Sequence, residues 1–218
     1  MIATPEDQAL HEDKMTFDPQ KQTASDPKRD GIIKAAQALF LRDGFSKAIM
    51  ADVARDADVS TATLYKHFES KEELFAAVVR HTAASVQDDF GTMAPATTAR
   101  EFFFQALSSA HSVHQQAQVT ALLRVAIAEV SAAPELARYV FDTVVVGRYA
   151  RLQAALDEMV RRGLLKPHDT AFGARIGIGM IKELFVWPAL FVADFELPVD
   201  ALDRADEAIN IYLAAYGA

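Results

Sequence analysis

The segment at residues 59–68, VSTATLYKHF, concentrates side chains that donate hydrogen bonds. Its donors are the hydroxyl, imidazole and ammonium groups of Thr61, Thr63, Tyr65, Lys66 and His67. Phosphate oxygens accept hydrogen bonds from all of these groups, and a lysine can also donate to a guanine edge. The chemistry of the segment therefore fits contact with DNA. Its plainer interpretation is a solvated polar helix.

Helical spacing would place these donors on one outward surface. The side chains pair four residues apart, Thr61 with Tyr65, Ala62 with Lys66, and Thr63 with His67. Residues four apart lie on the same face of an α-helix. The opposite face would be held against neighbouring helices by the apolar side chains of Val59, Leu64 and Phe68.

Two helices are expected before this segment. Apolar residues recur at helical spacing from Lys28 to Leu41, and Gly44 follows where a left-handed C-terminal cap belongs. A second, shorter helix is expected from about Lys47 to Asp56.

Local signals delimit the helices that follow. Asp58 tolerates left-handed backbone angles and is expected in a turn. Ser60 is a natural N-cap for a helix that ends near His67. Ser70 and Glu73 form a capping box that opens a fourth helix, which is expected to reach the high eighties. Two short helices joined by such a turn form a helix-turn-helix, whose second helix enters the DNA major groove.

The rest of the chain is also helical in pattern. Breaks are expected at Pro95, Pro134, residues 163–167, Pro188 and Pro198. Strand signals, meaning short β-branched alternation bounded by Asn-Gly or Asp-Gly turns, are missing. The stretch TVVVG at 143–147 is therefore expected inside a buried helix. The expected fold is all-α with about nine helices.

Charge and composition narrow the class of protein. The net charge of −8 opposes phosphate binding, but residues 26–80 are neutral as a group, so the excess negative charge lies outside them. Cysteine is absent, which excludes disulfides and thiolate zinc sites. Residues 1–25 are polar without a sustained period and are expected to form a disordered arm. An uninterrupted apolar run of about 20 residues and a secretory signal are both missing, which favours a cytoplasmic protein.

The segment from Gly31 to Val79 resembles the DNA-binding domain of the TetR family of bacterial transcriptional regulators. The matching motifs are GF after the first helix, DVA, VS, T-LY-HF and SKEEL, in that order and spacing. The resemblance implies a DNA-binding domain at residues 26–80 and a ligand-binding and dimerisation domain at 81–218. It also implies base contacts by Thr61, Ala62 and Lys66, and phosphate contacts by Thr63, Tyr65, His67 and Lys71.

Two positions depart from the family's pattern. Ile49 stands where Thr or Ser usually caps the second helix and contacts phosphate, so this contact is either absent or supplied by Ser46 or Lys47. Asp58 stands where glycine is usual, and it is expected to point into solvent or to cap the third helix.

The segments at 124–165 and 173–191 resemble a C-terminal type found in regulators of efflux and related operons. That resemblance implies a ligand pocket between the middle helices. Its candidate lining residues, each of which could instead belong to the core, are Phe103, Leu107, Leu123, Ile127, Phe141, Met180, Trp187 and Phe191.

Four residues in the same region are considered as ligands of a metal ion or as contacts to a small molecule. His111, His114 and Glu129 form a sparse metal constellation, but two histidines without a third fixed ligand favour a surface or structural role, so no metal site is assigned. Arg124 and Glu129 either fix a polar group of a ligand or pair with each other at the surface.

In the family the last two long helices pair with those of a symmetry mate, so a homodimer is expected. Candidate interface residues are Gly173, Ile176, Gly177, Met180, Leu184, Ile209, Tyr212, Leu213 and Tyr216. Packing of the same residues within one chain is the alternative.

The resemblance implies a repressor that a small-molecule effector releases from a near-palindromic operator in double-stranded DNA. The alternative is a non-regulatory DNA-binding protein of the same fold, active in chromosome organisation or division. An enzyme is not expected, because a phosphate-cradling glycine loop, HExxH and GxSxG are all absent. Neither a cofactor nor a membrane partner is expected.

Overall fold

The computed structural model describes residues 26–85, 98–108, 111–192 and 194–218. Its helices are α1 Pro27–Asp43, α2 Met50–Asp56, α3 Thr61–His67, α4 Lys71–Ser85, α5 Ala99–Ser108, α6 His111–Ala128, α7 Pro134–Val140, the π-helical segment η3 Phe141–Val146, α8 Gly147–Arg161, α9 Thr170–Phe185, α10 Trp187–Phe191 and α11 Ala201–Tyr216. With α7, η3 and α8 counted as one continuous helix, the described residues form ten helices and no strand. The all-α prediction is confirmed. The expected arm at 1–25 and the break at Pro95 lie outside the described residues.

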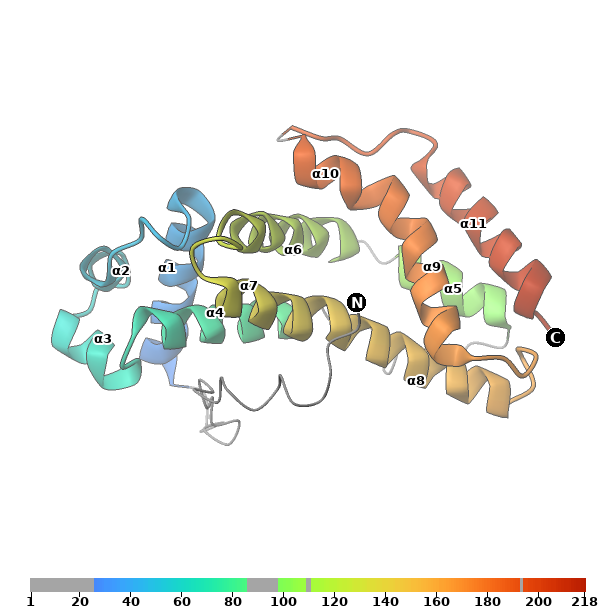
Figure 1. The fold of residues 1–218 in the computed structure, drawn as a ribbon, viewed down its shortest axis with the longest axis horizontal. Coiled ribbons are helices and arrows are strands. Elements are labelled where there is room, and N and C mark those ends of the chain that lie inside the picture. Colours follow the sequence, from blue (N-terminus) through green and yellow to red (C-terminus); the bar gives the residue numbers. More distant parts are fainter. Residues whose placement is uncertain (1–25, 86–97, 109–110, 193) are drawn as a thin grey trace, which may run out of the picture.

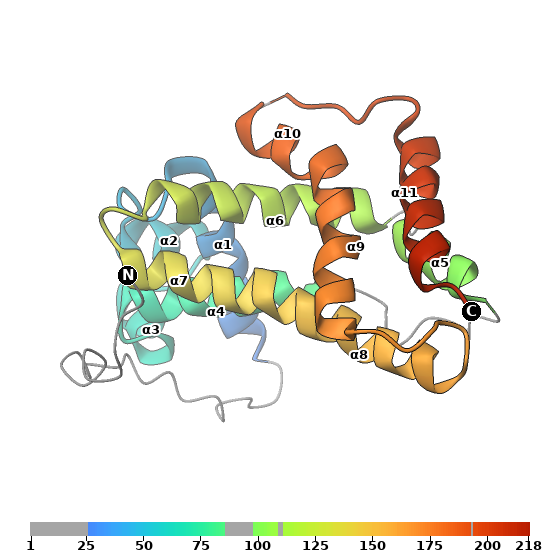
Figure 2. The ribbon, with the colours of Figure 1, turned by 45° about the vertical axis from the view of Figure 1, so that its right-hand side comes forward.

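The molecule is elongated, with α1–α4 gathered at one end (Figure 1). The helices α5, α9 and α11 lie at the opposite end, where the chain also terminates. Two long elements, α6 and the continuous helix from α7 to α8, run lengthwise between these ends in both views (Figures 1 and 2). The predicted DNA-contacting helix α3 is therefore at the tip farthest from α11.

The first helix illustrates how local signals fix an element. Asp26 Oδ1 accepts from the Lys28 N–H at 3.0 Å, and Pro27 stands in the first turn, where its missing N–H is harmless. The helix buries Ile32, Ile33, Ala36, Leu39 and Phe40. Gly44 ends it with a φ of +82°, which agrees with the expected glycine cap.

The start of α4 matches the expected capping box in part. Ser70 Oγ accepts from the Glu73 N–H at 3.1 Å. The Glu73 carboxylate, however, returns to the N–H of Glu69 at 2.7 Å, one residue earlier than the usual box predicts. Both backbone donors are satisfied, so the function of the box is preserved.

The segment around 143–147 is helical as expected but only partly buried. Val144 is buried, whereas Phe141 and Val146 are 50% and 42% exposed. A π-helical segment at this point links α7 to α8 without a break. The expectation of a helix is correct, and the expectation of burial is wrong for Val146, because one face of the helix packs on the core through Val144 while the other faces solvent.

Two clusters of buried apolar side chains make the core. The first unites α1–α4 with α6, α7 and η3, and it includes the ring cluster of Phe40, Phe45 and Phe75, whose centroids lie 5.1 to 5.7 Å apart. The second unites α5, α8, α9 and α11. The first cluster crosses the expected boundary at residue 80, so the DNA-contacting end is packed directly on α6 and α7.

Candidate DNA-binding interface

Helix α3 is fixed by a local cap and two buried anchors. Ser60 Oγ accepts from the Thr63 N–H at 3.1 Å, and the two hydroxyl oxygens lie 2.8 Å apart. Leu64 and Phe68 are completely buried. The inward face is thus secured by apolar contacts, and the N-terminal end of the helix remains open to a partner.

The structure leaves most of the predicted contact residues on the outward face of α3. Thr61, Ala62, Tyr65 and Lys66 are exposed, and Tyr65 is 51% exposed despite its aromatic ring. Thr63 is partly buried and shares a hydrogen bond with the Ser60 hydroxyl. The outward face of α3 thus carries two hydroxyls, a methyl group and an ammonium that are accessible to a partner.

His67 is less available than its neighbours. Its ring is partly buried, and Nδ1 lies 3.7 Å from Asp26 Oδ2 at the start of α1. The pairing holds the end of α3 next to the start of α1. A phosphate contact by His67 stays a prediction, and the phosphate would have to compete with the Asp26 carboxylate for the ring.

Helix α2 starts without a side-chain cap. It begins at Met50, not near Lys47 as expected, because Ile49 occupies the N-cap position in an extended conformation, and its side chain cannot accept a hydrogen bond from the first turn. The turn after α2 places Asp58 at a φ of +53°, in the left-handed region, and leaves it exposed. Ser60 caps α3, so of the two roles expected for Asp58, capping α3 or pointing into solvent, the structure shows the second.

Lys71 clamps the loop between α1 and α2. Its ammonium donates to the carbonyl oxygens of Phe45 at 3.0 Å, Ala48 at 3.2 Å and Ser46 at 3.4 Å. It also lies 4.5 Å from the centroid of the Phe45 ring. An ammonium has three N–H donors, so all three are engaged. The phosphate contact predicted for Lys71 conflicts with this geometry.

Glu129 holds the same loop from the other side. Its carboxylate accepts from the Ser46 N–H at 3.0 Å and from the Ser46 hydroxyl at 2.6 Å, and Glu129 is only 6% exposed. The hydroxyl of Ser46 therefore does not replace the missing cap of α2. Neither role considered for Glu129, with a ligand or with Arg124, is the one observed. The sequence offered no signal for this contact, because the two residues are 83 positions apart.

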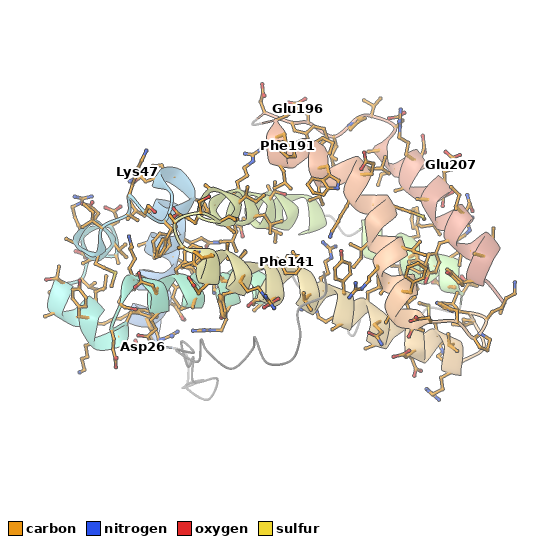
Figure 3. All side chains as sticks on the ribbon, in the orientation of Figure 1. Asp26, Lys47, Phe141, Phe191, Glu196 and Glu207 are labelled. Atoms are coloured by element: carbon orange, nitrogen blue, oxygen red, sulfur yellow. The ribbon has the colours of Figure 1, made fainter. Side chains whose placement is uncertain are left out.

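Charge pairing leaves few cations available near α3. Arg42 bonds with Asp43, and Arg55 bonds with both Asp52 and Asp56. Among the described residues, Lys47 and Lys66 form no ion pair and are exposed. Figure 3 shows Lys47 projecting outward from the α1–α2 loop. Lys66 on the face of α3 and Lys47 beside α2 are the cations best placed for phosphate or base contact.

Family models match two stretches of the chain. Residues 32–78 match the model of bacterial regulatory proteins of the tetR family, and residues 104–218 match that of the AefR-like transcriptional repressor C-terminal domain. The chain belongs to the TetR family. Family membership agrees with the helix-turn-helix geometry of α2 and α3.

Curated relatives are similar over about a quarter of the chain. The HTH-type transcriptional regulator UidR of Escherichia coli K12 is 40% identical over 58 residues, which cover 27% of this chain and 30% of UidR. The HTH-type transcriptional repressor NicS of Pseudomonas putida KT2440 is 36% identical over 61 residues, or 28% of this chain and 29% of NicS. The alignments thus span about a third of these relatives.

Solved structures are similar over nearly the whole chain. A TetR-family transcriptional regulator from Mesorhizobium loti MAFF303099 is 26% identical with a TM-score of 0.79, covering 90% of this chain and 100% of that one. The flavonoid-responsive regulator FrrA is 28% identical with a TM-score of 0.70, covering 88% of this chain and 97% of FrrA. The likeness extends through the C-terminal helices, where sequence resemblance is weaker.

The candidate ligand residues of this TetR-family chain do not converge in the described structure. Ile127, Phe141, Trp187 and Phe191 are 57%, 50%, 50% and 80% exposed. Phe141 and Phe191 stand on elements that α6 separates in both ribbon views (Figures 1, 2 and 3). Phe103, Leu123 and Met180 are partly buried against the two cores, and the side chain of Leu107 lies outside the described residues. A ligand pocket lined by these residues stays a prediction.

Several candidate dimer residues are used within the chain. A Cβ on Gly173 would lie 2.7 Å from the Tyr212 hydroxyl, and one on Gly177 would lie 3.6 Å from the Tyr212 ring. Tyr212 and Ile209 are buried, and burial beside Tyr216 raises the pKa of the Tyr212 hydroxyl. Gly173, Gly177 and Tyr212 thus pack α9 on α11 within the chain, and a part for them or for Ile209 in a dimer stays a prediction. The remaining candidates are partly exposed and stay predictions: Ile176, Met180, Leu184, Leu213 and Tyr216.

Arg124 has a structural role of its own. Its guanidinium donates to the carbonyl oxygens of Ala189, of Leu190 at 3.1 Å and of Val192 at 2.8 Å, so it caps the end of α10 from α6. The side chains of His111 and His114 lie outside the described residues, and the described part holds no group of three metal-ligating side chains. Nor does any helix described there have the length and apolar character needed to cross a membrane.

Proposed function

We propose that this protein is a transcriptional repressor whose homodimer places two α3 helices in successive major grooves of a near-palindromic operator. The observation that carries the proposal is the outward face of α3, where Thr61, Ala62, Tyr65 and Lys66 are exposed while Leu64 is completely buried. In a helix-turn-helix dimer the half-sites lie about 34–36 Å apart, one turn of DNA. Residues 26–80 would form the DNA-binding domain and 81–218 the ligand-binding and dimerisation domain. The protein would act in the cytoplasm, without catalysis.

Release of the operator would require an effector that binds the DNA-free conformation more tightly, since only differential affinity shifts an equilibrium. Two observations support such control. FrrA, a similar protein, is flavonoid-responsive. The α1–α2 loop is also bonded directly to Glu129 at the end of α6, so a shift of α6 would reach the DNA-binding end.

The test is fluorescence anisotropy with the promoter DNA beside the protein's own gene, at several salt concentrations. We expect binding that weakens steeply with salt. Tyr65→Phe should weaken binding to all sequences alike, and Lys66→Ala should also relax sequence preference, by about 1–3 kcal/mol at the base it contacts. Lys166→Ala removes an exposed lysine at the far end and is the matched control. Unchanged affinity in both α3 variants would contradict the proposal.

A non-regulatory DNA-binding role is the alternative. It rests on the same α3 surface, so affinity for DNA does not separate the two. Genome-wide occupancy does, because a repressor occupies a few promoter sites and a chromosome-organising protein occupies many dispersed ones.

A further inference from the structure

Two cations and a tyrosine form a cluster between α8 and α9, away from the DNA-binding end. Lys182 Nζ donates to the Tyr149 hydroxyl oxygen at 2.6 Å and lies 4.8 Å from the centroid of that ring. The guanidinium carbon of Arg175 lies 5.8 Å from the same centroid. Arg175 and Lys182 are nearly two helical turns apart on α9, so both lie on the side of α9 that faces Tyr149. Tyr149 is therefore flanked by two positive charges.

The cluster has hydrogen-bond donors to spare. The Lys182 ammonium uses one of its three N–H groups on Tyr149, and the Tyr149 oxygen acts as an acceptor there, which leaves its O–H to donate. Lys182 and Tyr149 are both partly buried. A partly desolvated cation is unfavourable unless an anion or several acceptors surround it.

Several other arginines of the chain are paired with carboxylates. Ion pairs join Arg100 to Asp206, Arg138 to Asp142, Arg161 to Glu158 and Arg204 to Asp200, at 2.5 to 2.9 Å. Within the part of the chain that the structure describes, Lys182 and Arg175 form no such pair. The chain as a whole carries 30 acidic residues against 22 lysines and arginines, so carboxylates are not scarce. Lys182 and Arg175 are thus cations that no described carboxylate pairs, in a chain whose net charge is −8.

We propose that Lys182 and Tyr149, with Arg175 beside them, bind the carboxylate of a small organic acid, and that such an acid is the effector. The second statement rests on the proposed function. A carboxylate has two oxygens, so it can accept from the ammonium and from the phenol at once, and charge-assisted bonds of this kind are about twice as strong as neutral ones. The partial burial of Lys182 favours a small anion over a side chain reaching in from a second copy.

The experiment uses the full-length protein and the fluorescence of Trp187, its single tryptophan, which begins the helix that follows α9. Benzoate and octanoate are titrated, each against its uncharged amide. We expect saturable binding of an acid and at least tenfold weaker binding of its amide. Lys182→Met should weaken acid binding about tenfold and Tyr149→Phe by less. Lys182→Arg, which keeps the charge, should retain the preference for acids.

Matched controls separate the outcomes. Lys166→Met removes an exposed lysine near the same helix and should leave acid binding unchanged. Equal binding of acid and amide, no acid binding up to about 50 mM, or full acid binding in Lys182→Met would each overturn the proposal. So would a Lys182→Met variant that alters only the monomer–dimer equilibrium in sedimentation, because the cluster would then be a contact between copies. If acid binding depends on Lys182 but the protein has no affinity for DNA, the proposed repressor function would be refuted and the proposed carboxylate-binding site would be supported.

Discussion

Helix α3 and the α1–α2 loop both serve the DNA-binding end, but they are held in opposite ways. Helix α3 has its own cap three residues away and its own buried anchors within the same short segment. The loop has no cap at Ile49 and is fixed by Lys71 and Glu129, which are 25 and 83 positions from Ser46. Helix α3 is thus capped by a neighbouring residue, although its anchors pack in the core that it shares with other helices. The loop depends on side chains far away in the sequence, so we expect a displacement of α6 to reach it through Glu129.

The strongest test of this contrast is Lys71→Met. We expect the free energy of unfolding to fall by about 2–3 kcal/mol, because three carbonyl contacts to a charged donor and a cation–π contact are lost. Urea unfolding measures the change. Lys47→Met, which makes the same substitution at an exposed position of the loop, should stay within about 0.5 kcal/mol. Weaker DNA binding without loss of stability would restore the phosphate role.

Glu129→Gln tests the long-range side of the loop. We expect a loss of about 1–2 kcal/mol in the free energy of unfolding, since two hydrogen bonds to a buried carboxylate are weakened. A double-mutant cycle with Ser46→Ala should give a coupling energy of about 1 kcal/mol. Glu135→Gln, at an exposed position on α7, is the control. Additive effects of the two substitutions would show that the contact carries no energy.

Ser60→Ala tests the local side. Loss of an N-cap costs about 1 kcal/mol of stability, and we expect that value for α3. Ser60→Asp should recover most of it, since aspartate is an equally good cap. Because the cap is local, its effect should be the same in the wild-type and Glu129→Gln backgrounds. A difference between the two backgrounds would mean that α3 also depends on α6.

Ile49→Thr gives the loop the local cap that it lacks. Its extended N-cap conformation suits threonine, and we expect a gain of about 0.5–1 kcal/mol in the free energy of unfolding. The loss caused by Glu129→Gln should then be smaller than in the wild type, as α2 would depend less on the distant contact. Thermal unfolding of the single and double variants measures both effects. No gain would indicate that α2 starts well without a cap.

Sequence reasoning succeeded where the responsible residues are close neighbours. The caps at Ser60 and Ser70 and the glycine end of α1 are decided within a few positions, so these ends of α1, α3 and α4 were predicted, whereas the cap at Asp26 was not. It was wrong about the start of α2. It also predicted that Lys71 contacts phosphate, whereas the Lys71 ammonium donates to carbonyl oxygens of the α1–α2 loop. It also missed the Lys182–Tyr149 contact, since a lysine and a tyrosine 33 positions apart carry no shared signal.

The sequence by itself determined the all-α fold and the outward chemistry of α3, because periodicity and capping act over one or two turns, and its motifs resembled those of the family. The tertiary structure decided which charged side chains remain available. From the sequence, Lys71, Arg124 and Glu129 were expected to lie at the surface or to bind DNA or a ligand. In the structure each of them is hydrogen-bonded to backbone or hydroxyl groups of a distant element. Lys182 is the reverse case, because packing brings this cation to a tyrosine and, within the described residues, to no carboxylate. Hydrogen bonds reach only about 3 Å, so only the packed chain settles these partners.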